Sequence, residues 1–84
     1  MDVNETEIRA GAFSPDQKFF VTGGNDAILR IWNIETGLCQ REFQGHGREI
    51  SAAEFSSNGR FMISAAVDGS IMLWELDWNW KFSE

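Results

Sequence analysis

The amino-acid sequence predicts an all-β protein made of two four-stranded antiparallel sheets. Three observations support this prediction: an internal repeat of 42 residues, tight-turn dipeptides between short apolar runs, and a third segment in each copy that is apolar on both faces. With 84 residues the chain holds two such copies and little else.

The internal repeat is a match without gaps between residues 7–34 and residues 49–76. Eight of these 28 pairs are identical, among them Asp26 with Asp68 and Trp32 with Trp74. Many of the other pairs conserve chemical character, as Val21 and Ile63 do. The period of a repeat decides its architecture, so the chain is predicted to consist of two units, residues 1–44 and 45–84.

Turn signals divide each unit into short strands. Asn58-Gly59 and Asp68-Gly69 lie between apolar runs, and such dipeptides accept the positive φ of tight hairpin turns. In the second unit the predicted strands are residues 50–55, 60–66, 70–75 and 78–82. The repeat places the first three 42 residues earlier in the first unit, whose fourth strand is predicted at residues 38–43. Each unit is therefore predicted to be a four-stranded antiparallel meander.

The third strand of each unit, residues 28–32 and 71–74, is apolar on both faces. A sheet with one face in water does not need this pattern, whereas a sheet with a neighbour on each side does. Small four-stranded sheets that stack face to face around an axis are the blades of a β-propeller, and such blades run about 40 to 45 residues. The sequence therefore predicts two propeller blades.

Several residues of the second unit stand at the positions of a known signature. They are Gly45-His46 before the first strand, Phe55-Ser56 at its end, Ser64 in the second strand, Asp68 in the next turn and Trp74 late in the third strand. Ser64, Asp68 and Trp74 follow His46 by 18, 22 and 28 residues. This set resembles the signature of WD-repeat β-propellers, and the end of the second unit resembles the final blade of bacterial WD-repeat arrays.

The resemblance implies a buried structural relay of hydrogen bonds. In the family the histidine bonds the aspartate of the turn and the hydroxyl of the second strand, and the contacts extend to the tryptophan N–H. The matching residues are His46, Asp68, Ser64 and Trp74, and the first unit offers Thr22, Asp26 and Trp32. Asn4 stands where the first unit would need a histidine. A Ser-His-Asp catalytic set is the alternative interpretation, but we expect no catalytic residue because the family spacing accounts for all three.

The strand count predicts that one chain is not a closed propeller. Two blades share one contact, and their outer faces would leave apolar residues in water, whereas closed propellers carry about four to eight blades. We expect a homo-oligomeric ring closed by head-to-tail contacts, with eight blades from four chains favoured over six from three. The alternative is that the chain is the last piece of a longer propeller.

The predicted function follows from this shape. In the ring, loop residues of both units would gather on one face, namely Glu7, Asn25, Arg48, Glu49 and Val67. The resemblance implies a protein-interaction scaffold without catalytic activity that binds a protein or peptide through this face. A structural or engineered fragment that self-assembles and has no evolved partner is the alternative. A third hypothesis is an enzyme or small-ligand binder that uses the central channel.

Composition argues against several other functions. The formal net charge is −6 and the seven basic residues are scattered, which disfavours a surface for nucleic acid or anionic membranes. Cys39 and His46 are single, so neither a disulfide within the chain nor the usual zinc ligand sets can form, and we expect no metal and no cofactor. No apolar run approaches the length of a membrane span and the first ten residues are polar, so we expect a cytoplasmic protein.

Overall fold

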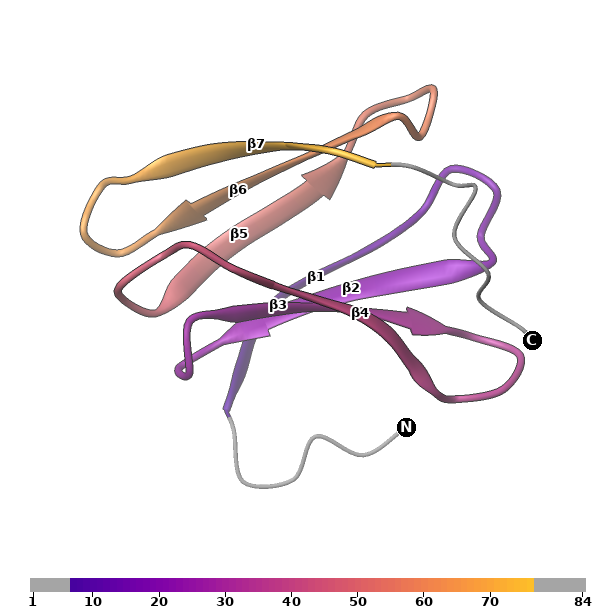
Figure 1. Ribbon diagram of the computed structural model, residues 1–84, viewed down its shortest axis with the longest axis horizontal. Coiled ribbons are helices and arrows are strands. Elements are labelled where there is room, and N and C mark those ends of the chain that lie inside the picture. The colour runs from indigo at the N-terminus through magenta and orange to yellow at the C-terminus, as the bar shows by residue number, and fades with distance from the viewer. Residues whose placement is uncertain (1–6, 77–84) are drawn as a thin grey trace.

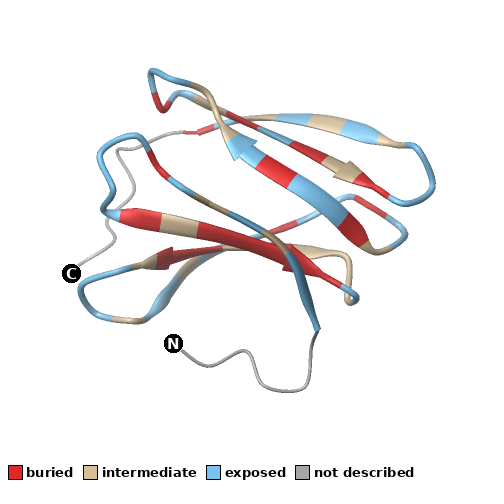
Figure 2. Cartoon of the chain, turned by 180° about the vertical axis from the view of Figure 1, so that it is seen from behind, coloured by how far each residue is buried: buried red, intermediate tan, exposed pale blue. Residues whose placement is uncertain are grey.

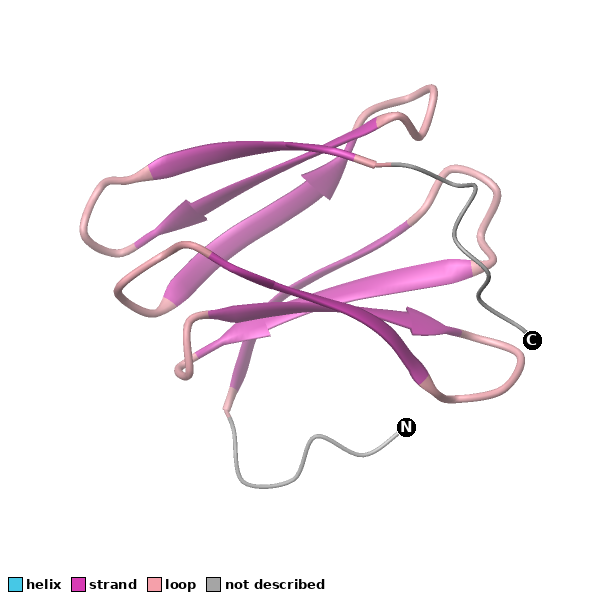
Figure 3. Ribbon diagram, viewed as in Figure 1, coloured by secondary structure: helices cyan, strands magenta, loops and turns pink. Residues whose placement is uncertain are grey.

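The computed structural model describes residues 7–76, which contain seven β-strands and no helix. The strands are β1 (Ile8–Phe13), β2 (Phe19–Gly24), β3 (Ile28–Asn33), β4 (Cys39–Gln44), β5 (Ile50–Phe55), β6 (Phe61–Ala66) and β7 (Ile71–Glu75). They form two antiparallel sheets, ordered β1-β2-β3-β4 and β5-β6-β7, which stack face to face (Figure 1). Short loops join consecutive strands (Figure 3). The all-β prediction is confirmed for the described residues.

The second sheet differs from the first in its number of described strands. The first sheet has the four strands of the predicted meander, whereas three strands of the second lie within residues 7–76. The predicted fourth strand at residues 78–82 lies outside the described residues and stays a prediction. The closed ring also stays a prediction, because the structure holds a single chain.

The turns that close the first hairpin of each sheet have the same construction. In the first sheet the Ser14 hydroxyl donates to Asp16 Oδ1 at 2.6 Å and accepts the Phe19 amide N–H at 3.0 Å. In the second sheet the Ser56 hydroxyl donates to Asn58 Oδ1 at 2.7 Å. Serine, aspartate and asparagine side chains favour such turns because they hydrogen-bond the nearby backbone. The 42-residue repeat therefore extends to individual hydrogen bonds.

Backbone conformation at the turns is repeated as well, but with different residues. Gln17 and Ala27 adopt φ angles of 62° and 66°, and the repeat-equivalent Gly59 and Gly69 adopt 73° and 89°. Glycine accepts this left-handed region freely, whereas a residue with a Cβ atom is strained there. The second unit therefore has the more relaxed turns.

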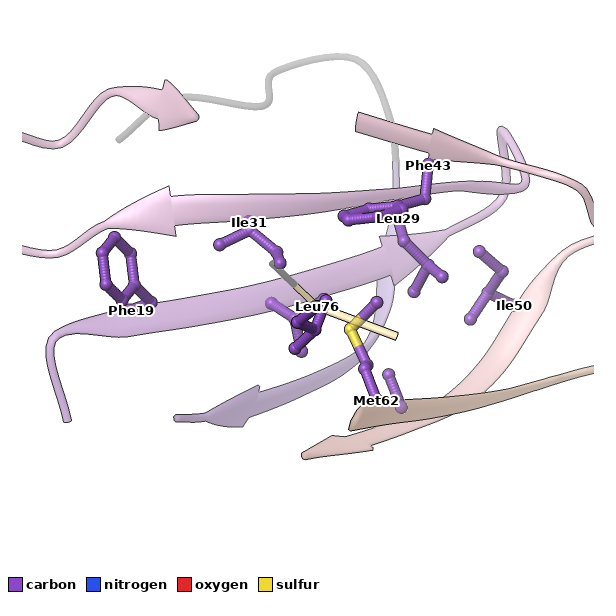
Figure 4. Close-up of a cluster of buried hydrophobic side chains, with 9 residues drawn as sticks. Phe19, Leu29, Ile31, Phe43, Ile50, Met62 and Leu76 are labelled. Atoms are coloured by element: carbon purple, nitrogen blue, oxygen red, sulfur yellow. The ribbon is translucent and has the colours of Figure 1, made fainter. Parts of the chain in front are cut away.

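The two sheets pack through β5, which lies against β1 and β2. Apolar side chains of both sheets point toward one another in this contact (Figure 4). The cluster consists of Phe19, Val21, Leu29, Ile31 and Phe43 from the first sheet and Ile50, Ala53, Met62 and Leu76 from the second unit. Gly23 allows the close approach, because a Cβ atom at this position would lie 2.7 Å from Ile50 Cγ2.

Burial is distributed unequally between the sheets. β2 and β3 carry mostly buried and partly buried residues, whereas β7 alternates between exposed and partly buried ones (Figure 2). A residue is removed from water only where another element covers it, and the second sheet covers one face of the first. The outer faces of both sheets have no such cover among residues 7–76.

Candidate functional site

His46 is the centre of a buried hydrogen-bonded chain in the second unit. It lies in the loop between β4 and β5 and is buried. Its Nε2 atom is 2.8 Å from the Ser64 hydroxyl in β6, and its Nδ1 atom is 2.9 Å from the Ser70 hydroxyl in the turn before β7. The Trp74 indole N–H in β7 donates to Ser64 Oγ at 2.9 Å. One imidazole therefore ties the β4–β5 loop to two other elements.

All hydrogen bonds of this network are donated in the same direction, from Trp74 toward Asp68. The Ser70 hydroxyl donates to Asp68 Oδ1 at 2.7 Å, so its oxygen accepts the proton on His46 Nδ1. His46 Nε2 is then the acceptor of the Ser64 hydroxyl, whose oxygen accepts the Trp74 N–H. Neutral imidazole has one donor and one acceptor, and this arrangement uses both. The network assigns the Nδ1–H tautomer to His46.

The first unit holds its equivalent residues differently. The Trp32 indole N–H donates to Thr22 Oγ1 at 2.9 Å, as Trp74 does to Ser64. Asp26, however, pairs with Arg30 at 2.8 Å, and Arg30 also contacts Glu42 at 3.2 Å. Burial by itself lowers the pKa of Arg30, but the two carboxylates outweigh it and leave that pKa raised. The turn aspartate of the first unit thus forms an ion pair, whereas the turn aspartate of the second unit accepts a hydrogen bond from Ser70. Asn4 lies outside the described residues.

The predicted loop residues lie at one end of the two sheets, which we call the loop face. The loop face comprises the β2–β3 turn, the β4–β5 loop and the β6–β7 turn, which lie at the left edge of Figure 1, together with Glu7 immediately before β1. The Asn25 amide N–H donates to the Glu7 carbonyl at 3.1 Å, and the Val67 amide N–H donates to the Glu49 carbonyl at 2.9 Å. Equivalent backbone hydrogen bonds therefore fix the loops that the first unit and the second unit contribute to the loop face.

Side chains also connect the loop face. The Asn25 side-chain amide donates to Glu7 Oε1 at 3.0 Å and accepts from Arg9 Nη1 at 3.1 Å. Arg48 Nε donates to Glu49 Oε1 at 3.0 Å. The pKa of Glu49 is lowered, first by its own backbone amide, then by the hydrogen bond and charge of Arg48, with a smaller contribution from the charge of Arg9. Arg9 belongs to the first unit, so its charge acts across the contact between the sheets.

Comparison with known proteins agrees with this geometry. The sequence profile of the family described as "WD domain, G-beta repeat" matches residues 3–33 and 37–75. The chain belongs to the WD-repeat family. Proteins of this family act mainly as protein-interaction scaffolds. The family resemblance inferred from His46, Ser64, Asp68 and Trp74 is therefore confirmed.

Relatives share short stretches with this WD-repeat chain. It is 46% identical over 43 residues to the general transcriptional corepressor TUP1 of Saccharomyces cerevisiae, a match that covers 51% of the chain and 6% of TUP1. It is 34% identical over 50 residues to WD repeat domain-containing protein 83 of Mus musculus, which covers 60% of the chain and 16% of that protein. The chain thus spans at most about a sixth of these relatives. Both relatives are eukaryotic, and the resemblance of the second unit to the final blade of bacterial WD-repeat arrays stays a prediction.

One detail of the expected WD-repeat relay differs in the structure. The family pattern implied a direct bond from His46 to Asp68, but among residues 7–76 the carboxylate reaches the imidazole through the Ser70 hydroxyl. Asp68 is exposed, and hydrogen bonds from the Ser70 side chain and amide lower its pKa. Sequence reasoning missed Ser70. A hydroxyl two residues after the turn aspartate, in Asp68-Gly69-Ser70, was the available signal.

The WD-repeat relay is arranged for structure rather than for nucleophilic chemistry. Ser64 is 1% exposed, and its hydroxyl already bonds both His46 and Trp74. A catalytic serine needs access to a substrate carbonyl, which this position does not provide. Within residues 7–76, no group of three or more histidine, cysteine, aspartate or glutamate side chains could hold a metal ion. The described part of the chain also contains no helix of the length and apolarity that a membrane span requires.

Proposed function

We propose that this WD-repeat chain is a non-catalytic scaffold that binds a protein or peptide through its loop face. The observation that carries the proposal is that equivalent hydrogen bonds from both units hold exposed side chains at the same end of the molecule. Rigid scaffolds that display loop residues are typical binding surfaces. The proposed contact residues are Glu7, Asn25, Arg48, Glu49 and Val67.

The chemistry of the loop face suits a protein partner. Arg48 and Val67 are exposed and place a cationic and an apolar side chain on it. The Glu49 carboxylate accepts a hydrogen bond from Arg48, and the Glu7 carboxylate accepts one from Asn25. Arginine and apolar anchors surrounded by polar groups are common at protein interfaces. The buried relay of His46, Ser64 and Trp74 supports the face by fixing the loop that carries Arg48. We assign the relay a positioning role.

We further propose that the scaffold acts as a ring of several chains in the cytoplasm, without a metal or cofactor. Four chains with eight blades are favoured over three chains with six. A ring would present several copies of the loop face and so increase the apparent affinity for a repeated or clustered partner. A structural or engineered fragment, whose main property is self-assembly without an evolved partner, is the alternative.

The test is capture of partners by the immobilised full chain. A variant with both Arg48→Ala and Val67→Ala is expected to lose the captured proteins at least tenfold. Arg60→Ala is the matched control, because Arg60 is exposed in the β5–β6 turn at the other end of the sheets. If the double variant captures the same proteins in the same amounts, the loop face is not the binding surface. If the wild-type chain captures nothing specific, the self-assembling alternative is favoured.

A further inference from the structure

The outer face of the second sheet is an exposed apolar surface. Ile63 in β6 and Ile71 and Leu73 in β7 are 47%, 69% and 68% exposed. We call this surface the β6–β7 face. Contiguous apolar side chains in water mark surfaces that another molecule covers.

The same repeat positions are buried in the first sheet. Val21, Leu29 and Ile31 precede Ile63, Ile71 and Leu73 by 42 residues, and each is 0% exposed. They are buried because β5 and the rest of the second sheet cover them. The structure therefore contains one covered and one uncovered example of the same surface.

The outer face of the first sheet also carries exposed apolar side chains. Ile8 and Phe13 in β1 are exposed, and Phe13 meets Phe20 of β2 edge to face at 4.8 Å. We call this surface the β1–β2 face. The repeat-equivalent Ile50 is fully buried, and Phe55 packs on the core cluster as a partly buried residue. Inside the chain, a surface of the first sheet packs against a surface of the second sheet. The repeat-equivalent surfaces, the β6–β7 face and the β1–β2 face, are both exposed.

We propose that the β6–β7 face of one copy docks on the β1–β2 face of a second copy, in the way that the first sheet docks on the second within the chain. This inference rests on the proposed ring and specifies its contact. The internal arrangement, in which β5 lies against β1 and β2, corresponds between copies to β1 of the second copy lying against β5 and β6. Because the two faces differ, the contact is head-to-tail.

A hollow on the β6–β7 face supports this fit. Its volume is about 150 Å³, and its lining residues are Ala52, Ala53, Glu54, Ile63, Ser64, Ala65 and Ile71. At the equivalent place in the first sheet, Ile50 approaches Gly23. The counterpart of Ile50 in a second copy is Ile8, which is exposed and available. Glu54 is the acidic residue of this lining and must keep a polar partner or water when the face is covered.

Sequence differences between the units make this contact looser than the internal one. Ala65 stands at the position of Gly23, so an added methyl group meets the incoming Ile8 where the internal contact has space for Ile50. The charge of Arg9 acts on Glu49 inside the chain, whereas Ser51 replaces the arginine at the equivalent position. Association between copies is therefore expected to depend on concentration while each chain stays folded.

The test uses one substitution on each face, with mass measured by light scattering or native mass spectrometry. Leu73→Asp places a charge on the β6–β7 face and Phe13→Asp places one on the β1–β2 face, so that each substitution prevents docking through its face. Each variant alone is expected to have the 9.5 kDa mass of a single chain. A mixture of the two is expected to form a one-to-one dimer, because each variant keeps the face that the other needs. Leu38→Asp is the matched control, since Leu38 is 62% exposed but lies in the β3–β4 loop.

Three results would overturn the proposal. A folded wild-type chain of single mass at all concentrations would show that copies do not cover these faces. A single variant that keeps the wild-type mass would exclude its face. A mixture that stays at single mass would exclude head-to-tail docking. Circular dichroism checks that each variant is folded, and the milder pair Ile71→Ser and Ile8→Ser replaces any variant that is not.

This outcome is independent of partner binding. Arg48→Ala and Val67→Ala change the loop face, not the two docking faces, and are expected to leave the mass unchanged. A wild-type chain that captures partners but stays at the mass of a single chain would therefore contradict the docking contact alone.

Discussion

The first and second units share one backbone plan but stabilise it with different polar groups. The second unit joins its turn aspartate to its tryptophan through Ser70, His46 and Ser64, whereas the first leaves Trp32 on Thr22 and pairs its turn aspartate with Arg30. The turn geometry at residues 14–19 and 56–61 is nevertheless the same. A repeat therefore conserves strand and turn positions more strictly than the side-chain network that supports them.

The largest expected difference between the units lies at a single apolar repeat position. Ile31→Ala should lower the free energy of unfolding by about 2–5 kcal/mol, because it opens a cavity in a fully buried cluster. Leu73→Ala, at the equivalent exposed position, should change it by less than about 0.5 kcal/mol in dilute solution. Urea unfolding followed by tryptophan fluorescence measures both. Equal losses in dilute solution would contradict the unequal burial, and a Leu73→Ala effect that grows with concentration would support docking of copies.

The relay should contribute more than its simpler counterpart. Ser64→Ala deprives His46 and Trp74 of a buried partner, and each unsatisfied group costs about 1–3 kcal/mol. Thr22→Val deprives Trp32 alone of its acceptor and should cost about half as much. Thermal unfolding of the two variants provides the comparison. A larger loss for Thr22→Val would show that the imidazole relay adds little stability.

The turns before β3 and β7 have alanine and glycine, respectively, at equivalent positions of positive φ, so each residue can be substituted by the other. Gly69→Ala should destabilise the chain by about 1 kcal/mol, because alanine is strained at positive φ while its methyl group would meet no atom within 4 Å. Ala27→Gly should relieve the same strain in the first unit and raise the melting temperature. Opposite shifts of the melting temperature are therefore expected, and shifts of the same sign would exclude backbone strain as their cause.

The smallest expected effect concerns acid sensitivity. Hydrogen bonds from the Ser14 hydroxyl and the Lys18 amide lower the pKa of Asp16 below its ordinary value of 3.8. A carboxylate with a depressed pKa contributes stability above its unfolded pKa, and this contribution is lost as the pH falls through the lower folded value. Asp16→Asn reproduces the residue type of the Asn58 turn and should make the melting temperature less dependent on pH below about pH 4. Asn58→Asp is the converse control, and an unchanged acid limb in both variants would contradict this role.

Much of the fold was predictable because its determinants are local. Asn58-Gly59 and Asp68-Gly69 indicate tight turns through backbone preference alone, and the repeat transfers the strands of one unit to the other. The observed strands begin or end within about a residue or two of the predicted ranges, as expected for element ends. The resemblance to WD repeats implied that His46, Ser64 and Trp74 meet, and the structure places the Ser64 hydroxyl within hydrogen-bond distance of both other side chains.

The sequence by itself determined the repeat and the turns, because these depend on backbone conformation and strand pairing over short distances. Its resemblance to WD repeats implied four members of the relay, His46, Ser64, Asp68 and Trp74. Only the tertiary structure decided that Ser70 lies between His46 and Asp68. The Ser70 hydroxyl occupies the Asp68 carboxylate oxygen that the imidazole would otherwise contact, and the spacing of these residues in the sequence does not reveal this. The tertiary structure also decided that Leu29 is buried and Ile71 exposed. The two residues are equivalent in sequence, but burial depends on what lies opposite, and the described chain places a sheet opposite only one of them.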